Sequence, residues 1–349
     1  QGFTVDGLYG PADVEESYVN KCVWIDGDSD DEVTPIDGFE MWNMLIQNCG
    51  SECIRLKNFV AGSIIRGNTI QNCGVYDYQF DRGEKNGEGI YIGTAKSQVL
   101  GTDSWNDDDE EDRCDMNYVN GNTIETNGNE CVEVKEGSTG NVIENNVCRY
   151  QLDEESGCFG SRGDANTFRY NTVSDCKGAG VRLGGWDGYG QGNNVYGNYV
   201  TNAEFAFLKV QVENQGVICG NTCGTGACDV NGDDVDIIEA TYFKECSLSE
   251  INSITKAEPF SEGSSLPTAG TPSPVGDSIT EESPSPIYNS PSPSTSPPTL
   301  SPTTSETSET SETSESSSSS YLSWVKWADD GEDDDDKEDD DDKEDDDDG

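Results

Sequence analysis

The sequence predicts an all-β fold, a right-handed parallel β-helix of about seven coils, with a disordered C-terminal tail. An Asn-containing turn string recurs along the first two thirds of the chain, mostly at spacings of 23–27 residues. A short string of alternating apolar and polar residues precedes most of these turns, and none of these strings shows the 3.6-residue period of a helix. Repeats of this length are typical of coils that stack and bury one continuous core.

The turn string takes forms such as RGNTIQNCG (66–74) and NGNTIETNG (120–128). Asn suits a turn because its side chain bonds to nearby backbone and it tolerates positive φ. Stacked Asn side chains can also form a hydrogen-bonded ladder. An acidic insertion at 101–115 explains the one long interval. A disordered low-complexity segment is the alternative, but apolar alternation persists in every repeat. The equivalent residues are Asn43, Asn68, Asn122, Asn146, Asn171, Asn198 and Asn221.

The alternating strings define which side chains face the core, because successive strand residues point to opposite sides. The strings are CIRLKN (53–58), GIYIGT (89–94), CVEVKE (131–136), CFGSRG (158–163) and GVRLGG (180–185). Their mostly apolar members are predicted to point inward: Ile54, Leu56, Ile90, Ile92, Val132, Val134, Phe159, Ser161, Val181 and Leu183. Two outward columns remain: Arg55, Tyr91, Glu133, Gly160 and Arg182, and beside them Lys57, Gly93, Lys135, Arg162 and Gly184.

Composition limits the functional classes. The formal net charge of −50 argues against nucleic acid as a partner, since phosphate binding needs a basic surface. The absence of His removes His-dependent nucleophilic sites and His-liganded zinc. Thirteen Cys favour an oxidising compartment, and a chain that starts at Gln1 is expected to be the mature form of a secreted protein. No apolar run is long enough for a membrane span, and no organic cofactor is expected.

Composition also divides the chain. Residues 1–40 are predicted to form an N-terminal cap, 41–227 the β-helix and 228–257 a C-terminal cap. Residues 258–320 form a Ser/Thr/Pro-rich stalk that cannot build a core and is expected to carry O-linked glycans. Residues 321–349 hold 14 Asp and 3 Glu against 3 Lys, so this polyacidic tail is predicted to stay extended and to attract cations or polycations.

The same alignment predicts disulfide bonds between neighbouring coils. Cys49 and Cys73 occupy equivalent positions, as do Cys131 and Cys158, and stacked strands bring such residues to a bonding distance. Cys148 falls on an inward position, so it is expected to be a free buried thiol.

The charged outward columns have two interpretations. They form either a solvated sheet face whose charges pair across coils, or a groove for an acidic polysaccharide. In the second interpretation Arg55, Lys57, Arg182 and Glu133 contact the polymer, while Tyr91, Tyr189 and Trp186 stack on sugar rings. The sequence leaves both open.

The strings NGEGIYIGTA, ECVEVKEGSTGNVIENN, GCFGSRGDANTFRYN and GAGVRLGG, in this order, resemble secreted right-handed β-helix repeat proteins of the pectate-lyase-like superfamily. They are more distantly similar to the chondroitinase B and alginate lyase family. The resemblance covers about residues 35–225. It implies a catalytic arginine at Arg162 and a calcium ligand at Glu130. The family's second acidic ligand position is Val132 here, and the neighbouring Glu133 is the candidate for that role. The family's catalytic lysine position is Gly137 here, and the nearest lysine is Lys135.

The resemblance implies a lyase that cleaves uronate polymers by β-elimination. Calcium or arginine would neutralise the substrate carboxylate, Lys135 or Arg162 would remove the C5 proton, and Tyr91 or water would protonate the leaving oxygen. A C5-epimerase or a hydrolase are enzymatic alternatives. The competing class is a non-catalytic extracellular wall, matrix or assembly protein whose acidic tail binds cations.

Overall fold

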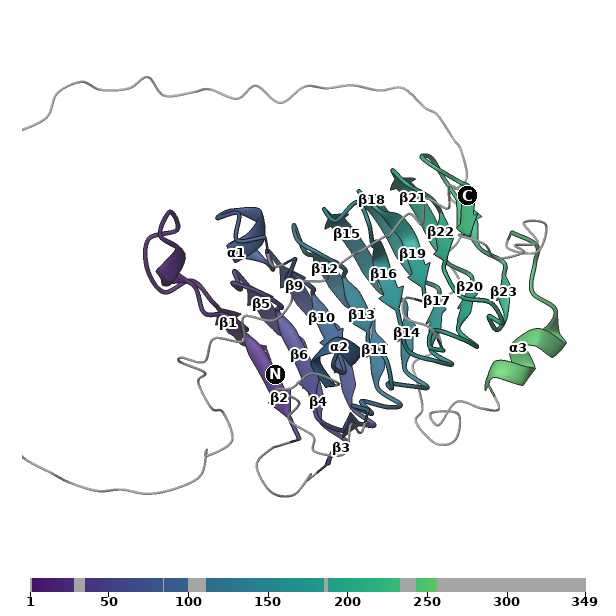
Figure 1. The fold of residues 1–349 in the computed structure, drawn as a ribbon, viewed down its shortest axis with the longest axis horizontal. Helices are drawn as coiled ribbons and strands as arrows, with labels where there is room; N and C mark the ends of the chain where they lie inside the picture. The colour runs from purple at the N-terminus through teal and green to yellow at the C-terminus, as the bar shows by residue number, and fades with distance from the viewer. Residues whose placement is uncertain are drawn as a thin grey trace, which may run out of the picture. The chain divides into compact units, whose positions relative to one another are not determined.

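The fold comes from a computed structural model that describes residues 2–27, 35–83, 85–99, 111–184, 188–232 and 243–255. The predicted stalk and the polyacidic tail lie outside these residues. Three parallel sheets run side by side along the stacked coils (Figure 1). Within the described residues, no helix is long and apolar enough to cross a membrane.

Each full coil contributes one strand to each sheet, in the order second, third, first. The first sheet contains β1 (Thr4–Asp6), β5 (Leu45–Gln47), β9 (Thr69–Gln71), β12 (Thr123–Glu125), β15 (Val147–Gln151), β18 (Thr172–Cys176), β21 (Tyr199–Ala203) and β24 (Thr222–Cys223). The second sheet contains β2 (Val23–Asp26), β6 (Ile54–Lys57), β10 (Ile90–Ile92), β13 (Val132–Val134), β16 (Gly157–Ser161), β19 (Ala179–Leu183), β22 (Leu208–Val210) and β25 (Val230–Gly232).

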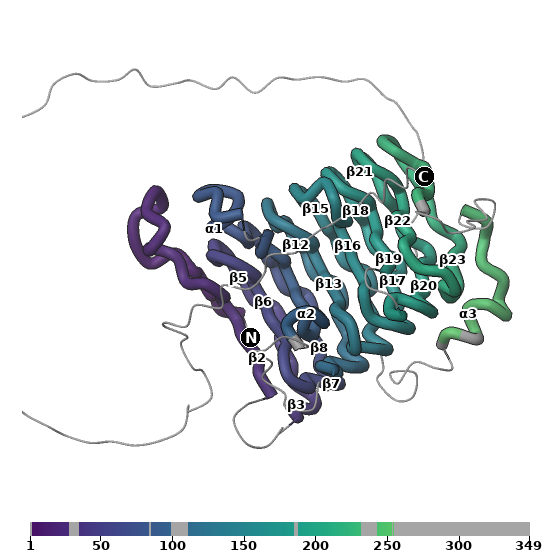
Figure 2. Tube along the Cα trace, in the orientation of Figure 1, coloured from purple at the N-terminus to yellow at the C-terminus, as the bar shows by residue number. Residues whose placement is uncertain are grey.

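The third sheet contains β4 (Glu40–Trp42), β8 (Ile64–Arg66), β11 (Tyr118–Asn120), β14 (Val142–Glu144), β17 (Thr167–Arg169), β20 (Asn194–Tyr196) and β23 (Ile218–Cys219). A small pair joins β3 (Ile36–Asp37) to β7 (Val60–Ala61). The described helices are short: η1 (Glu15–Ser17), α1 (Val75–Tyr78), α2 (Lys96–Val99) and α3 (Leu248–Thr255). The trace advances in one direction from coil to coil (Figure 2). The predicted parallel β-helix is therefore confirmed.

The core is a stack of aliphatic and aromatic side chains inside the coils. Every residue of the second sheet that was predicted to point inward is buried, from Ile54 to Leu183, and Ser161 is the one polar member of the set. Burying one such apolar side chain contributes about 1.5–3 kcal/mol. Because the chain alternates faces, this burial forces Arg55, Tyr91, Glu133 and their neighbours to the outside of the coils.

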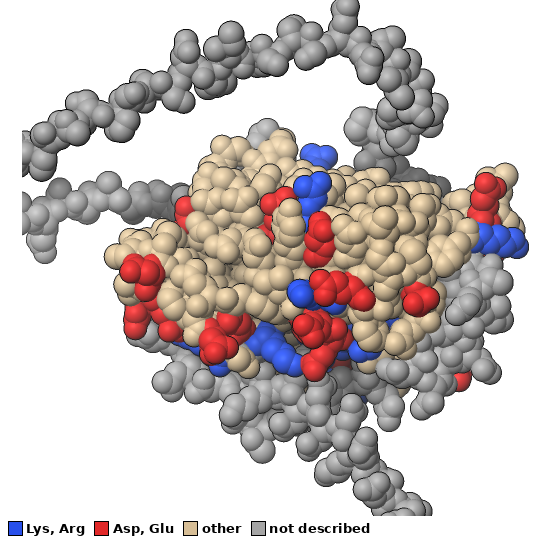
Figure 3. Space-filling model, turned by 90° about the horizontal axis from the view of Figure 1, so that it is seen from above, with Lys and Arg blue, Asp and Glu red and all other residues tan. Residues whose placement is uncertain are grey.

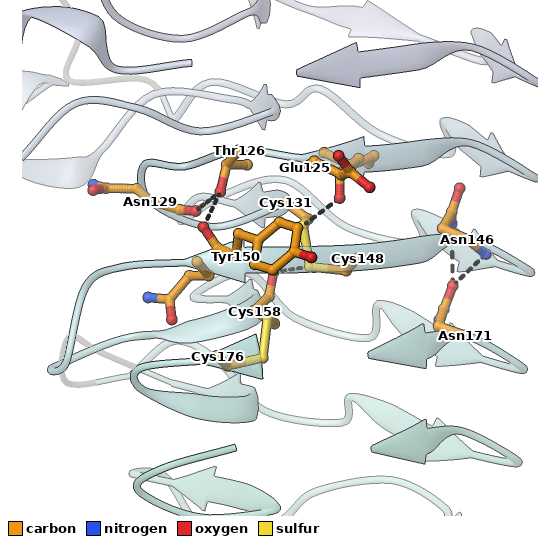
Figure 4. Close-up of a disulfide and its surroundings, with 12 residues drawn as sticks. Glu125, Thr126, Asn129, Cys131, Asn146, Cys148, Tyr150, Cys158, Asn171 and Cys176 are labelled. Atoms are coloured by element: carbon orange, nitrogen blue, oxygen red, sulfur yellow. Dashed lines mark hydrogen bonds between the residues drawn. A yellow bond between two sulfur atoms is a disulfide. The ribbon is translucent and has the colours of Figure 1, made fainter. Parts of the chain in front are cut away.

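An asparagine ladder lines one corner of the coils, as predicted. Nδ2 of each Asn donates to Oδ1 of the next at 3.0–3.1 Å, and the backbone N–H of the same residue donates to that oxygen as well (Figure 4). The prediction is wrong for Asn43. The backbone N–H of Met44, and not the side chain of Asn43, donates to Oδ1 of Asn68. A second ladder was not predicted. The first ladder runs through Asn68, Asn122, Asn146, Asn171, Asn198 and Asn221, and the second through Asn117, Asn141, Asn166 and Asn193.

Four of the six disulfides close single coils and do not join neighbouring ones. Cys49, Cys73, Cys131 and Cys158 are all disulfide-bonded, but both predicted pairings are wrong. In four coils the observed bond joins the second-sheet side to the first-sheet side of the same turn, and Figure 4 shows two of these bonds, Cys131–Cys148 and Cys158–Cys176. Sequence alignment found equivalent positions, but it carried no information about which sheets face each other across the core. The bonds are Cys22–Cys49, Cys53–Cys73, Cys131–Cys148, Cys158–Cys176, Cys219–Cys246 and Cys223–Cys228.

The free thiol is Cys114, which is buried, and the prediction that Cys148 is free is therefore wrong. Cys148 does face the core, aligned with Val173 on the next strand, and from there it reaches Cys131. Burial raises the pKa of the Cys114 thiol well above its usual value, and the nearby Asp112 carboxylate adds to this effect.

Candidate functional site

The outer face of the second sheet carries the predicted column of polar residues. Parallel pairing places Arg55 beside Tyr91, Tyr91 beside Glu133, and Glu133 beside Gly160. The column continues through Arg182 to Lys209 on the following coils. Neighbouring strands are about 4.8 Å apart, so these positions form one row, in which Gly160 is the one member without a side chain. The predicted register of the outward column is confirmed.

Tyr91 lies between two cations. The guanidinium carbon of Arg55 is 3.6 Å from the centre of the Tyr91 ring, and Nζ of Lys135 is 4.7 Å from it. Arg55 is fixed in turn by Glu52, whose Oε1 accepts a hydrogen bond from Nη1 at 2.7 Å. Cation–π contacts of this kind strengthen when they are shielded from water. The two cations therefore hold the Tyr91 ring in place. Arg55 comes from the preceding coil and Lys135 from the following coil.

Glu133 lies at the centre of the charged groups. Its Oε1 is 3.4 Å from Nε of Arg162 and 4.0 Å from Nζ of Lys135. The carboxylate occupies the space above Gly160, where an added Cβ would overlap Oε2. Glycine on the adjacent strand thus makes room for a carboxylate that reaches toward two cations. On the other side of Arg162, its Nη1 is 4.0 Å from Oε1 of Glu136.

The charged side chains of this cluster are buried, Glu133, Lys135 and Arg162 among them, which the sequence did not predict. The exposed fractions are 0% for Glu133, 4% for Lys135 and 6% for Arg162. The expectation that Glu133 and Lys135 lie on an exposed face is therefore wrong. Part of the cover comes from the chain after β10, since Gln98 approaches Arg55 and the backbone N–H of Lys96 donates to Glu136. These residues belong to α2 (Lys96–Val99), which lies over the strands of this region in Figure 1.

A row of three buried glutamates borders the column, and sequence reasoning missed it as a group. Glu52, Glu88 and Glu130 each stand two residues before the first inward residue of β6, β10 and β13. All three are buried. The strings ECI, EGI and ECV carry the signal, because they repeat Glu at one fixed position. Stacked coils turn that repetition into neighbouring carboxyl groups.

The surroundings shift the pKa values of the buried carboxyl groups in different directions. Burial and the neighbouring Glu130 raise the pKa of Glu88 well above its usual value. Burial also acts on Glu52, but the charges of Lys21 and Arg55 outweigh it and lower the pKa of Glu52 to about 2. Burial and Glu130 raise the pKa of Glu133 to about 7, against the opposing charges of Lys135, Arg162 and Arg182. Shifts of this size are typical of functional sites, although structural charge networks produce them too.

The remaining predicted site residues divide into three cases. Arg182 stands at the edge of the cluster, where Nη1 is 4.0 Å from Glu130 and Nε donates to Gln211. Lys57 lies two residues beyond Arg55, with its ammonium 5.7 Å from the ring of Trp24. Trp186 lies outside the described residues. Acidic and basic side chains are interspersed on the part of the surface seen in Figure 3, and neither sign dominates it.

The predicted calcium ligands do not form a built cation site among the described residues. No group of three or more Asp, Glu or Cys side chains suited to a metal ion is found there. Glu130 accepts a hydrogen bond from Ser156, and Glu133 already faces Arg162 and Lys135, which would repel a further cation. Calcium binding therefore stays a prediction, and no step proposed below uses it.

Comparisons with known proteins add fold likenesses alone. No family model and no curated protein sequence matches the chain. Similar solved structures include an alginate lyase from Paenibacillus sp. str. FPU-7, with 21% identity over 57% of this chain and 65% of that one, at a TM-score of 0.47. Another is DFA-IIIase from Arthrobacter chlorophenolicus A6 without its lid, with 14% identity over 62% of this chain and 48% of that one, at a TM-score of 0.40. The chain covers less than two thirds of either protein, and we base no functional argument on these likenesses.

Proposed function

We propose that this chain is an extracellular β-helix protein that binds an acidic polysaccharide on the second sheet and cleaves it by β-elimination. The observation that carries the proposal is the assembly of Arg55, Tyr91, Lys135 and Arg162 around Glu133 on one face. Six disulfides among the described residues support an oxidising, extracellular setting.

The chemistry divides among these side chains. Arg162, with its planar fork of donors, pairs with the uronate carboxylate and makes the C5 proton more acidic. Lys135, when neutral, removes that proton as a general base. The electron pair of the C5–H bond forms the C4–C5 double bond, the C4–O4 bond breaks, and the Tyr91 hydroxyl protonates the leaving oxygen. Arg55, stacked on Tyr91, keeps the phenol in place.

The test measures the ultraviolet absorbance of the unsaturated product while the full-length protein meets alginates, pectates and glycosaminoglycans. We expect one of these polymers to give rising absorbance. Lys135→Ala and Arg162→Ala should each lower the rate about 100-fold or more, because each removes a group that acts in the transition state. Arg149→Ala is the matched control, since Arg149 is an exposed arginine on the first sheet paired with Glu125 at 3.6 Å.

A second candidate is a non-catalytic wall or matrix protein. The observation that favours it is the burial of Glu133, Lys135 and Arg162 together with their mutual pairing, which is also what a purely structural charge cluster shows. Two results together, obtained with folded protein, would favour this candidate over the lyase. No polymer gives an unsaturated product, and the thermal stability of the Lys135→Ala variant is the same with and without polymer.

A further inference from the structure

Trp24 stands on β2, at the N-terminal end of the row that crosses the second sheet. Parallel pairing aligns it with Arg55, and Arg55 with Tyr91. The Trp24 side chain is 37% exposed, whereas Tyr91 is 2% exposed. An aromatic ring has to present its face to solvent before a sugar can stack on it. Trp24 therefore offers a stacking surface that the Tyr91 ring does not.

Two lysines lie beside the Trp24 ring. Nζ of Lys21 is 5.4 Å from the ring centre, and Nζ of Lys57 is 5.7 Å from it. Asp26, which pairs with Lys57 across the strands, accepts a hydrogen bond from Nδ2 of Asn58 at 2.6 Å. The exposure of the indole shows that the lysines leave part of it uncovered. The end of the row is thus an open aromatic surface with two positive charges next to it.

Glu52 connects this surface to the buried cluster. Its Oε2 is 3.5 Å from Nζ of Lys21, and its Oε1 accepts the hydrogen bond from Arg55 at 2.7 Å. Burial opposes ionisation of Glu52, but the charges of Lys21 and Arg55 outweigh it and lower its pKa to about 2. One ionised carboxylate therefore holds both the lysine beside Trp24 and the arginine stacked on Tyr91.

The chemistry of this surface matches one unit of a uronate polymer. The C–H face of a sugar ring packs on the electron-rich face of an indole, and the carboxylate of the same unit pairs with ammonium groups. We propose that Trp24, Lys21 and Lys57 form a distal binding subsite for the acidic polysaccharide, several sugar units from the bond that is cleaved. The inference rests on the proposed function and specifies how the same sheet selects long chains over short ones.

The position of the subsite sets the length of polymer that benefits from it. Four strand steps lead from β2 to β16, through β6, β10 and β13. At a strand spacing of about 4.8 Å, the indole lies about 19 Å along the sheet from the coil that carries Arg162. One sugar unit is too short to span this distance. Only an oligosaccharide that runs across the coils therefore reaches both Trp24 and Arg162.

A distal subsite holds the substrate equally before and during the reaction, so it acts on KM and leaves kcat unchanged. Trp24→Leu should raise KM about tenfold for polymer and for long oligosaccharides. Oligosaccharides too short to span the coils should be unaffected. Trp24→Phe, which keeps an aromatic face, should retain most of the affinity. Lys57→Ala should weaken binding of long chains and make it less sensitive to salt.

The experiment uses the full-length protein and size-fractionated oligosaccharides of alginate and of pectate. Product absorbance gives KM and kcat, calorimetry gives affinity, and thermal unfolding checks that each variant is folded. Trp42→Leu is the matched control. Trp42 also has a cation beside its ring, Arg66 at 5.2 Å, but it lies on β4 of the third sheet. Its replacement should leave KM unchanged at every length.

The outcomes separate this inference from the proposed function. Cleavage by folded Trp24→Leu with an unchanged KM, or with an equal loss for short and long chains, would overturn the subsite and leave the lyase standing. Length-dependent binding that requires Trp24, without any unsaturated product, would support the subsite and reject the lyase. If no uronate oligosaccharide binds to the folded wild type, both fail.

Discussion

The carboxylate of Glu133 lies over the α-carbon of Gly160 on the next coil, in the space that any larger residue would fill with a side chain. We expect Gly160→Ala to displace this carboxylate from Arg162 and to cost about 1–3 kcal/mol of unfolding free energy. In a Glu133→Ala background the same change should cost almost nothing, or stabilise the strand slightly, since glycine weakens strands.

Urea unfolding of the wild type, both single variants and the double variant completes a thermodynamic cycle. A coupling energy of about 1 kcal/mol or more is expected from residues in direct contact. Additive effects of the two substitutions would contradict the contact between Glu133 and Gly160.

The raised pKa of Glu133 predicts how stability depends on pH. The folded state binds this proton more tightly than the unfolded state, whose carboxyl group titrates near 4.5. The resulting stabilisation is complete below pH 4.5 and disappears as pH rises through about 7. The shift corresponds to about 3 kcal/mol. Glu133→Gln should therefore flatten the fall in unfolding free energy between pH 5 and pH 8.

Denaturant unfolding at several pH values checks this slope, with Glu125→Gln as the variant that should keep it. An unchanged slope in Glu133→Gln would mean that another group causes the fall, and the raised pKa of Glu88 makes that residue the next to replace.

The asparagine ladder predicts a large cost for a single interior substitution. Nδ2 of Asn146 donates to Asn171 and to the carbonyl of Val119, while its Oδ1 accepts from Asn122. Asn146→Ala leaves these buried groups without partners, so we expect a loss of about 2–4 kcal/mol. Asn120→Ala, which removes a half-buried amide on the outer surface near Glu144, should cost under about 1 kcal/mol. Thermal or urea unfolding distinguishes the two.

The disulfide arrangement predicts one hidden thiol. Cys114 is fully buried, and its raised pKa keeps it protonated, so an alkylating reagent at mildly alkaline pH should not label the folded protein. In denaturant without reductant, one label per chain should appear at Cys114. Peptide mapping should recover Cys131–Cys148 and Cys158–Cys176. A peptide that links Cys131 to Cys158 would instead restore the pairing expected from sequence alignment.

Local periodicity was sufficient to predict the coil architecture. The alternation in CIRLKN and CVEVKE assigned Ile54 and Val132 to the core and Arg55 and Glu133 to the outside, because strand geometry allows no other arrangement. Repetition of Asn at a near-constant spacing predicted the ladder, since stacked coils place equivalent residues one above another.

What periodicity alone leaves open is what lies across the core and what covers the outer face. Cys131 had an equivalent partner in sequence, Cys158, but the first sheet brings Cys148 closer to it. Glu133 and Lys135 were correctly placed outside the coil, yet their burial depends on segments that return from other parts of the chain. The sequence by itself determined the direction of each strand side chain, because that is a property of neighbouring residues. Only the tertiary structure decided the disulfide partners, the carboxyl row of Glu88 and Glu130, and the protonation of Glu133, because distance and burial depend on the packing of residues remote in sequence.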